Sequence, residues 1–300
     1  AGARSLSAQT IDDLDKELCE QIHQLTNKQL SKKGTPYHGL AKWADGKRRG
    51  FPVEVFTTNY DLLVEQALED QRVPYFDGFA GGRKPFFDLR AMEEDEIPDR
   101  WVRLWKLHGS INWFQDSDNG VCRGPADSKD SVQRVIHPSH LKYQQSRRLP
   151  YLAMMDKLRS FFRKETAILV IVGYSFRDEH INEIIVQGLR ASPGSVAFAL
   201  QRSALEKYPE ATALAEGQNN LNVLAQDGAV IGGSTRSWPE KDAEAASSVR
   251  ASWLEWIPKD PGKREGVHKA VFKLGDFAVL GAFLQELAGV STSAGDGDAK

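Results

Sequence analysis

Residues 167–178 indicate the fold class of this chain, and they read Ala167-Ile-Leu-Val-Ile-Val-Gly-Tyr-Ser-Phe-Arg-Asp178. Every residue from 167 to 172 is apolar, and Ile181, Ile185 and Leu189 follow at helical spacing. An apolar run that leads through a glycine turn into an amphipathic helix is typical of a buried strand in an α/β protein. The run therefore predicts a central parallel strand at 167–173 that is buried on both faces.

Similar runs occur on both sides of this segment. Short stretches rich in apolar and β-branched residues predict further strands at 53–58, 102–107, 196–200 and 222–225. Stretches with helical spacing separate several of them, and strands that alternate with helices favour βαβ units. We therefore expect an α/β fold with a Rossmann-like, mainly parallel sheet flanked by helices, and with helical and loop insertions.

The remaining stretches read as peripheral to this sheet. Residues 9–29 have the spacing of an amphipathic helix, and residues 277–287 predict a final apolar helix. Residues 232–248 read as an excursion between the last strand and that helix. We expect one domain over residues 1–290 and a disordered tail at 291–300, where Gly, Ser and Asp predominate.

Composition excludes several classes of protein. Of 300 residues, 41% are hydrophobic and 27% are charged, and 39 basic against 41 acidic residues leave a formal charge of −2. This balance predicts no direct nucleic-acid binding, and the apolar run at 167–172 is far shorter than the roughly 20 residues of a membrane span. No leader peptide opens the chain, so we expect a cytoplasmic protein without a membrane association.

Metal chemistry finds little support in the sequence. Cys19 and Cys122 are the only cysteines, and two cysteines cannot build a four-thiolate zinc site. His137 and His140 lie three residues apart, but no carboxylate or cysteine nearby completes a metal set, and we interpret them as solvated loop residues. We therefore expect no metal site and no zinc.

Polar residues follow the first two of these strands, at the edge where α/β sheets bind their ligands. Thr58, Asn59 and Asp61 come directly after the strand at 53–58, and His108 follows the strand at 102–107. Taken alone, Thr58 or Asn59 reads as a helix cap, and a histidine before a glycine reads as a turn residue.

The third junction follows the apolar run. Gly173 permits close backbone approach, and Ser175 precedes a helix whose free amides suit an anion such as a pyrophosphate. A plain cap of that helix by Ser175 or Asp178 is the alternative.

Together the three junctions are more specific than any one of them. Thr-Thr-Asn-Tyr-Asp (57–61), Lys-Leu-His-Gly-Ser-Ile-Asn-Trp (106–113) and Val-Gly-Tyr-Ser-Phe-Arg-Asp-Glu-His-Ile (172–181) occur in the order of the sirtuin NAD-binding core. The sequences of these motifs resemble those of the sirtuin-like NADase domains of bacterial antiphage defence proteins more closely than those of the protein deacylases. The resemblance covers the chain from residue 1 to about residue 287.

The resemblance extends to the first residues. Family members begin with a strand and a Gly-Ala-Gly-x-Ser loop that wraps the pyrophosphate, and Ala1-Gly2-Ala3-Arg4-Ser5 resembles the end of that loop. The leading glycine and its strand are absent, and Arg4 sits one place out of register. We therefore expect that the first strand is missing from this chain because its start is trimmed.

The resemblance implies roles for the residues of these motifs. Asn59 would orient a water and bind the nicotinamide ribose, and His108 would take a proton from a ribose hydroxyl or from water. Asp61 would bind the nicotinamide carboxamide in a pocket that Thr58 also lines. Gly2 would bind the pyrophosphate, and Gly173 with Ser175 the phosphate and adenosine-ribose side. NAD+ is then the substrate, and no further cofactor is needed.

One departure from the deacylases bears on the reaction. Their four-cysteine zinc module, which helps to form the peptide cleft, cannot be built from Cys19 and Cys122. Water is then the natural acceptor, so the resemblance implies an NAD+ glycohydrolase that releases ADP-ribose and nicotinamide. A non-catalytic sensor of NAD or ADP-ribose is the alternative, and a protein deacylase is a weaker one.

The family also implies a setting. Such an activity would be the toxic effector of an antiphage abortive-infection system, and it must be gated. The resemblance therefore implies a homo-oligomer, with a HerA-type ring ATPase or an Argonaute-type activating partner.

Overall fold

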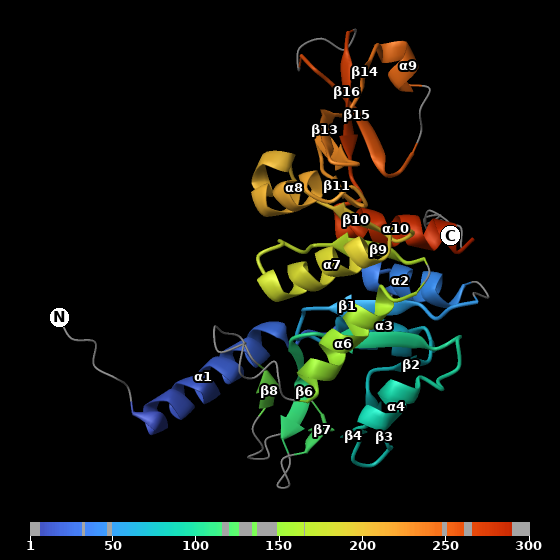
Figure 1. Cartoon of the computed structure of the whole chain (residues 1–300). Helices are drawn as coiled ribbons and strands as arrows, with labels where there is room; N and C mark the ends of the chain where they lie inside the picture. Colours follow the sequence, from blue (N-terminus) through green and yellow to red (C-terminus); the bar gives the residue numbers. More distant parts are fainter. Residues whose placement is uncertain are drawn as a thin grey trace, which may run out of the picture. The chain divides into compact units, whose positions relative to one another are not determined.

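The computed structural model describes residues 7–31, 34–46, 50–115, 120–125, 134–136, 149–164, 166–247, 251–260 and 266–289 (Figure 1). The contacts divide the chain into two compact units. Unit 1 comprises Ala1–Lys33 and Lys47–Lys157, and unit 2 comprises Gly34–Gly46 and Leu158–Lys300. Gly2, His137, His140 and the tail at 291–300 lie outside the described residues.

Unit 1 carries two small sheets with helices beside them. Its elements are α1 (Ala8–Thr26), β1 (Glu54–Thr57), α3 (Leu63–Asp70), β2 (Tyr75–Phe76), β3 (Phe79–Ala80), β4 (Phe86–Phe87), α4 (Leu89–Glu94), β5 (Val102–Lys106), β6 (Gly109–Gln115), β7 (Val121–Arg123) and β8 (Arg134–Ile136). The first sheet has the order β1-β5-β2 and is parallel throughout. The second has the order β3-β4-β7-β6-β8 and is antiparallel.

The core of unit 1 is built on β5 and β6. All five residues of β5 are buried, and Trp105 and Trp113 are 1% and 0% exposed. Burial of aromatic rings of this size is a large hydrophobic contribution to stability. Helix α1 adds a smaller cluster, in which Cys19 packs with Ile111 and the half-buried Tyr60 and Leu62.

Unit 2 is built on a mixed sheet in the order β13-β12-β11-β10-β9, in which β9, β10 and β11 run parallel. Its elements, with α6 (Tyr151–Phe161) crossing the boundary from unit 1, are α2 (Pro36–Asp45), β9 (Ile168–Val172), α7 (Glu179–Ala191), β10 (Val196–Leu200), η1 (Leu205–Lys207), α8 (Pro209–Glu216), β11 (Leu221–Leu224), β12 (Gly228–Ile231), β13 (Ser234–Ser237), β14 (Glu240–Lys241), α9 (Ala243–Ser247), β15 (Leu254–Pro258), β16 (His268–Phe272) and α10 (Phe277–Leu287). Strands β14, β16 and β15 form a separate antiparallel sheet, which lies beside α9 in Figure 1. Residues 232–248, which the sequence marked only as an excursion, contain β13, β14 and α9.

The α/β class and the Rossmann-like arrangement of parallel strands with intervening helices are confirmed. The five predicted strands agree with β1, β5, β9, β10 and β11 to within one residue at either end, and the final helix has the predicted bounds.

The prediction for β9 is wrong in one respect. Among the described residues β9 pairs only with β10, so it is an edge strand, and Ile168 and Val170 are 69% and 51% exposed. The opposite face carries Ile171, which is buried. An apolar run shows that the side chains are hydrophobic, but it does not show how many strands pair with the run. The sequence could therefore not distinguish an edge strand from a central strand.

Candidate functional site

The turn after β1 carries three of the predicted residues. Thr58 and Asp61 are half-buried and Asn59 is exposed. The backbone amide of Asn59 donates to Oγ1 of Thr57 at 3.1 Å, and Oδ1 of Asp61 accepts from the amide of Leu63 at 3.0 Å. Helix α3 has no side-chain cap at Leu62, so neither Thr58 nor Asn59 acts as the helix cap that the alternative interpretation proposed.

The turn after β5 carries His108. Strand β5 ends at Lys106 and β6 begins at Gly109, whose φ of +94° is a conformation that glycine adopts readily. The imidazole of His108 is half-buried, and its centroid lies 6.5 Å from that of the Tyr60 ring. The glycine thus lets the chain turn directly after His108.

The structure brings these two turns together. Strands β1 and β5 are parallel and in register, with Thr57 opposite Lys106. The amide of Leu107 donates to the carbonyl of Thr57 at 2.8 Å, and the amide of Ile111 donates to that of Tyr60 at 3.0 Å. Thr58, Asn59, Asp61 and His108 therefore form one group at the carboxyl edge of the β1-β5-β2 sheet, which we call the candidate cluster.

A buried cation underlies this cluster. Lys106 is 1% exposed, and its Nζ lies 2.9 Å from Oε1 of Glu65 on α3. The same Nζ donates to the carbonyl of Asp61 and lies 3.5 Å from that of Tyr60. Burial raises the pKa of Glu65, and the charge of Lys106 opposes that increase. Sequence reasoning assigned no role to Lys106 or Glu65, although a lysine at the end of an apolar strand was a usable signal.

The loop from Gly173 to Asp178 belongs to unit 2. Gly173 has φ +67° and is exposed, and Ser175 is exposed as well. Helix α7 begins only at Glu179, and Oδ1 of Asp178 accepts from the amides of His180 and Ile181. The capping alternative therefore holds for Asp178 and not for Ser175, because the Asp178 carboxylate already uses two of the amides at the helix start.

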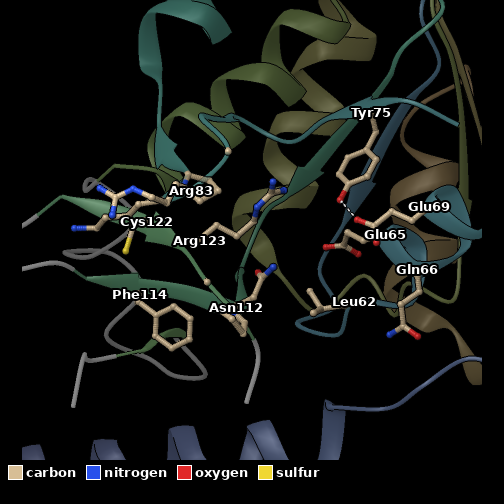
Figure 2. A pocket seen from close by; sticks show the side chains of 15 residues that line it. Leu62, Glu65, Gln66, Glu69, Tyr75, Arg83, Asn112, Phe114, Cys122 and Arg123 are labelled. Atoms are coloured by element: carbon tan, nitrogen blue, oxygen red, sulfur yellow. Dashed lines mark hydrogen bonds between the residues drawn. The ribbon is translucent and has the colours of Figure 1, made fainter. Parts of the chain in front are cut away.

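A cavity of about 610 Å³ lies within unit 1 (Figure 2). One side is formed by α3 with Glu65 and Glu69, and the other by the segment 82–85 and by β6 and β7 with Asn112 and Arg123. None of the four residues of the candidate cluster lines it. The cavity and the cluster are neighbours along the chain, because Leu62 comes directly after Asp61 and lines the cavity together with Glu65 of α3.

The polar groups of this cavity are mostly paired. The hydroxyl of Tyr75 donates to Glu69 at 2.8 Å, as Figure 2 shows, and Arg123 forms an ion pair with Asp77. Burial raises the pKa of Tyr75, and the charge of Glu69 adds to the effect. Burial likewise raises the pKa of Asp77, against the opposing charge of Arg123. Within the described residues, Oδ1 of Asn112 is a buried acceptor without a donor.

The remaining predictions concern metals and membranes. Cys19 is buried and Cys122 is half-buried, and the two cysteines do not form a disulfide. Over the described ranges, no group of three or more His, Cys, Asp and Glu side chains is placed to hold a metal ion.

The helices in the described part of the chain were also compared with the requirements of a membrane span. None of them is both long enough and apolar enough to cross a bilayer.

Comparison with known proteins adds one match. A family model described as a SIR2-like domain matches residues 53–223, which is more than half of the 300 residues. The matched span contains the whole candidate cluster together with Gly173 and Ser175. No curated protein matches the chain significantly.

Proposed function

Because this chain belongs to the SIR2-like domain family, whose members use NAD+, we propose that it hydrolyses NAD+ to ADP-ribose and nicotinamide. The proposal is supported by the candidate cluster, in which backbone hydrogen bonds join the turn that carries Asn59 and Asp61 to the turn that carries His108. An imidazole can exchange a proton near neutral pH, and an amide can both donate and accept a hydrogen bond.

The proposed reaction requires few groups. The bond between the nicotinamide nitrogen and C1′ of the ribose breaks, and its electron pair neutralises the charge of the nicotinamide ring. A water oxygen bonds to C1′ and transfers a proton to His108. Asn59 orients that water and the ribose, and Asp61 holds the carboxamide in a pocket that Thr58 lines.

The pyrophosphate and the adenosine half of NAD+ need contacts outside the candidate cluster. We assign the phosphate and adenosine-ribose contacts to Gly173 and Ser175, and the pyrophosphate contact to Gly2. Gly173 supports this assignment because no atom lies within 4 Å of the place where a Cβ would be, so the backbone is open to a ligand there.

The proposal extends to the biological setting through the resemblance of the three motifs. We assign the protein to the cytoplasm as the toxic effector of an antiphage abortive-infection system. Its activity is gated in a homo-oligomer, with a HerA-type ring ATPase or an Argonaute-type protein as the activating partner.

The test of the activity is NAD+ consumption by the purified full-length protein, alone and with any partner encoded beside it, with products separated by chromatography. Asn59→Ala should lower the release of nicotinamide and ADP-ribose by about 100-fold, because the attacking water loses its orientation. Asn219→Ala, an exposed asparagine in unit 2, is the matched control and should behave as the wild type.

Two other outcomes contradict the proposal. Tight NAD+ binding without turnover, with or without the partner, would favour the sensor. Nicotinamide release only in the presence of an acetylated peptide would favour the deacylase.

His108→Ala is expected to remain folded, because His108 lies in a turn and is only half-buried. Its turnover should fall by about 100-fold or more, since a general base contributes about 10²–10⁴-fold. His268→Ala on β16 is the control, and circular dichroism of both variants checks the fold. Unchanged turnover by His108→Ala would remove His108 from the site.

A further inference from the structure

Lys106 joins the two halves of the candidate cluster. Its backbone belongs to β5 and is separated from His108 by one residue. Its ammonium reaches the other turn, where it donates to the carbonyl of Asp61 and lies 3.5 Å from that of Tyr60. One side chain therefore connects the strand that carries His108 with the turn that carries Asn59 and Asp61.

The contacts of Lys106 use its full hydrogen-bonding capacity. An ammonium has three N–H donors, and the three acceptors are the carbonyls of Tyr60 and Asp61 and the carboxylate of Glu65. A charged group that is 1% exposed is tolerated only when it is paired in this way. The position of Nζ is thus fixed by three groups, and two of them are backbone atoms of the turn.

Glu65 holds the Lys106 ammonium from helix α3. It lies in the first turn of α3, the helix that begins two residues after Asp61, and its side chain is 9% exposed. The turn is therefore attached to β5 at its start, through Thr57 and Leu107, and at its end, through the ion pair between Lys106 and Glu65. The peptide planes after Tyr60 and Asp61 cannot rotate without breaking bonds to a buried cation.

We propose that Lys106, held by Glu65, is a positioning residue that fixes the Asn59–Asp61 turn relative to His108 in the proposed NAD+ site. This inference rests on the proposed hydrolysis, because it concerns the geometry of the same groups. A misplacement of about 1 Å between reacting groups lowers a rate by roughly 100-fold.

A pair of variants separates positioning from simple stability. Lys106→Met alone leaves Glu65 buried without its partner and should destabilise the protein. The double variant Lys106→Met/Glu65→Leu removes both charges, and replacing a buried ion pair by apolar residues is often neutral for stability. In the double variant the Asp61 carbonyl still lacks the Lys106 ammonium, whereas the Tyr60 carbonyl keeps the amide of Ile111 as a donor. We expect its melting temperature to return toward that of the wild type, its kcat to stay about 100-fold low, and its KM for NAD+ to change only a few-fold.

Arg103 provides a matched control on the same strand. It is 2% exposed, pairs with Asp95 at 3.1 Å, and donates to the carbonyls of Ile97, Pro98 and Trp101. Like Lys106, it is a buried cation bonded to one carboxylate and to backbone carbonyls, but it holds a different loop. Arg103→Met should therefore lower stability and leave the kcat of the folded protein close to that of the wild type.

Hydrogen exchange provides a readout that needs no activity. In the double variant, amides in the segment 57–63 should exchange faster while those in 95–101 stay as in the wild type, and Arg103→Met should show the reverse. If the double variant does not fold, Glu65→Gln takes its place in the test. It keeps an oxygen that accepts from Lys106, so amide exchange at 57–63 should be faster than in the wild type by a smaller factor.

The failures of the two proposals are distinguishable. A wild type that never turns over NAD+ overturns the hydrolase, and faster exchange at 57–63 would still show that Lys106 holds the turn. A folded double variant with the kcat and exchange of the wild type overturns the positioning role while the hydrolase stands.

Discussion

Tyr174 holds the loop that carries Gly173 and Ser175. Its hydroxyl donates to Oδ1 of Asn182 at 2.8 Å and lies 3.0 Å from the carbonyl of Asp178. The side-chain amide of Asn182 in turn donates to the carbonyl of Phe176 at 2.7 Å. Burial raises the pKa of Tyr174, and the charge of Asp178 adds to the effect. The neutral phenol of Tyr174 therefore stabilises the loop at 173–178, which we propose to contact the phosphate.

The raised pKa of Tyr174 predicts a loss of stability at alkaline pH. An unfolded tyrosine ionises near pH 10, whereas Tyr174 keeps its proton to higher pH in the folded state. The folded state then binds more protons, so the free energy of unfolding falls as pH rises through 10. Tyr174→Phe should cost about 1 kcal/mol at pH 8 through the lost hydrogen bond. Urea unfolding from pH 8 to pH 11 should show this difference shrinking, and a difference independent of pH would contradict the assignment.

At this scale the sequence was informative about residues that follow strand ends. Asn59, Asp61 and His108 could be predicted to lie near one another because the carboxyl ends of parallel strands meet at one edge. Glu65 and Lys106 could not be paired, because they are 41 residues apart and the pairing depends on the packing of α3 against β5. The capping role of Asp178 was foreseen only as an alternative to ligand binding.

Helices α2 and α10 approach closely through glycines. A Cβ on Gly39 would lie 2.1 Å from the carbonyl oxygen of Gly281, and a Cβ on Gly281 would lie 2.4 Å from Cα of Pro36. Beside this contact the rings of Tyr37 and Phe277 pack edge to face, with centroids 4.9 Å apart. The absence of side chains at the two glycines is what lets the helix backbones meet.

Gly281→Ala should therefore destabilise unit 2. Alanine favours a helix over glycine by about 1 kcal/mol, but overpacking against the Pro36 backbone should outweigh this gain and leave a net loss of about 1–3 kcal/mol. Gly266→Ala is the control, because no atom lies within 4 Å of its Cβ position, and its effect should stay within about 0.5 kcal/mol. Thermal unfolding of both variants tests this, and equal melting temperatures would show that the helices can separate without loss.

At the scale of elements, apolar patterning predicted the strands that carry a core and missed the rest. Strand β13 is exposed along its whole length and has the sequence Ser-Thr-Arg-Ser, so no apolar signal marks it. Strands β2, β3 and β4 have two residues each, which is too short for a periodicity. The exposed edge of β9 is a property of pairing, which the residues of β9 alone do not encode.

At the scale of the molecule, neither unit is a continuous piece of chain. Residues 34–46 belong to unit 2 although the segments on both sides belong to unit 1. The match to the SIR2-like domain, at 53–223, includes parts of both units but leaves out α2 and α10. The paired helices thus lie outside the matched span.

Removal of α10 should therefore affect unit 2 as a whole. A chain that ends at Gly275 loses Leu280, Phe283 and Leu284, which pack in one cluster with Leu200 of β10 and Phe272 of β16. We expect the amides of β10 to lose most of their protection from hydrogen exchange, since loss of several large apolar side chains costs several times the roughly 2–5 kcal/mol of one. A chain that ends at Gly289 is the control and should keep that protection. Wild-type protection in the shorter chain would show that α10 is dispensable.

The pairing of α2 with α10 also sets the order in which this protein can be completed during translation. Helix α10 is made long after α2, because the strands of unit 1 and the sheet of unit 2 lie between them in the sequence. At about 5–20 residues per second, the interval between them is roughly 10–50 s. Throughout that time the glycine face of α2 is without its partner, while the strands of unit 1 emerge and can pair. The helix pair of unit 2 therefore forms only after α10 has emerged from the ribosome.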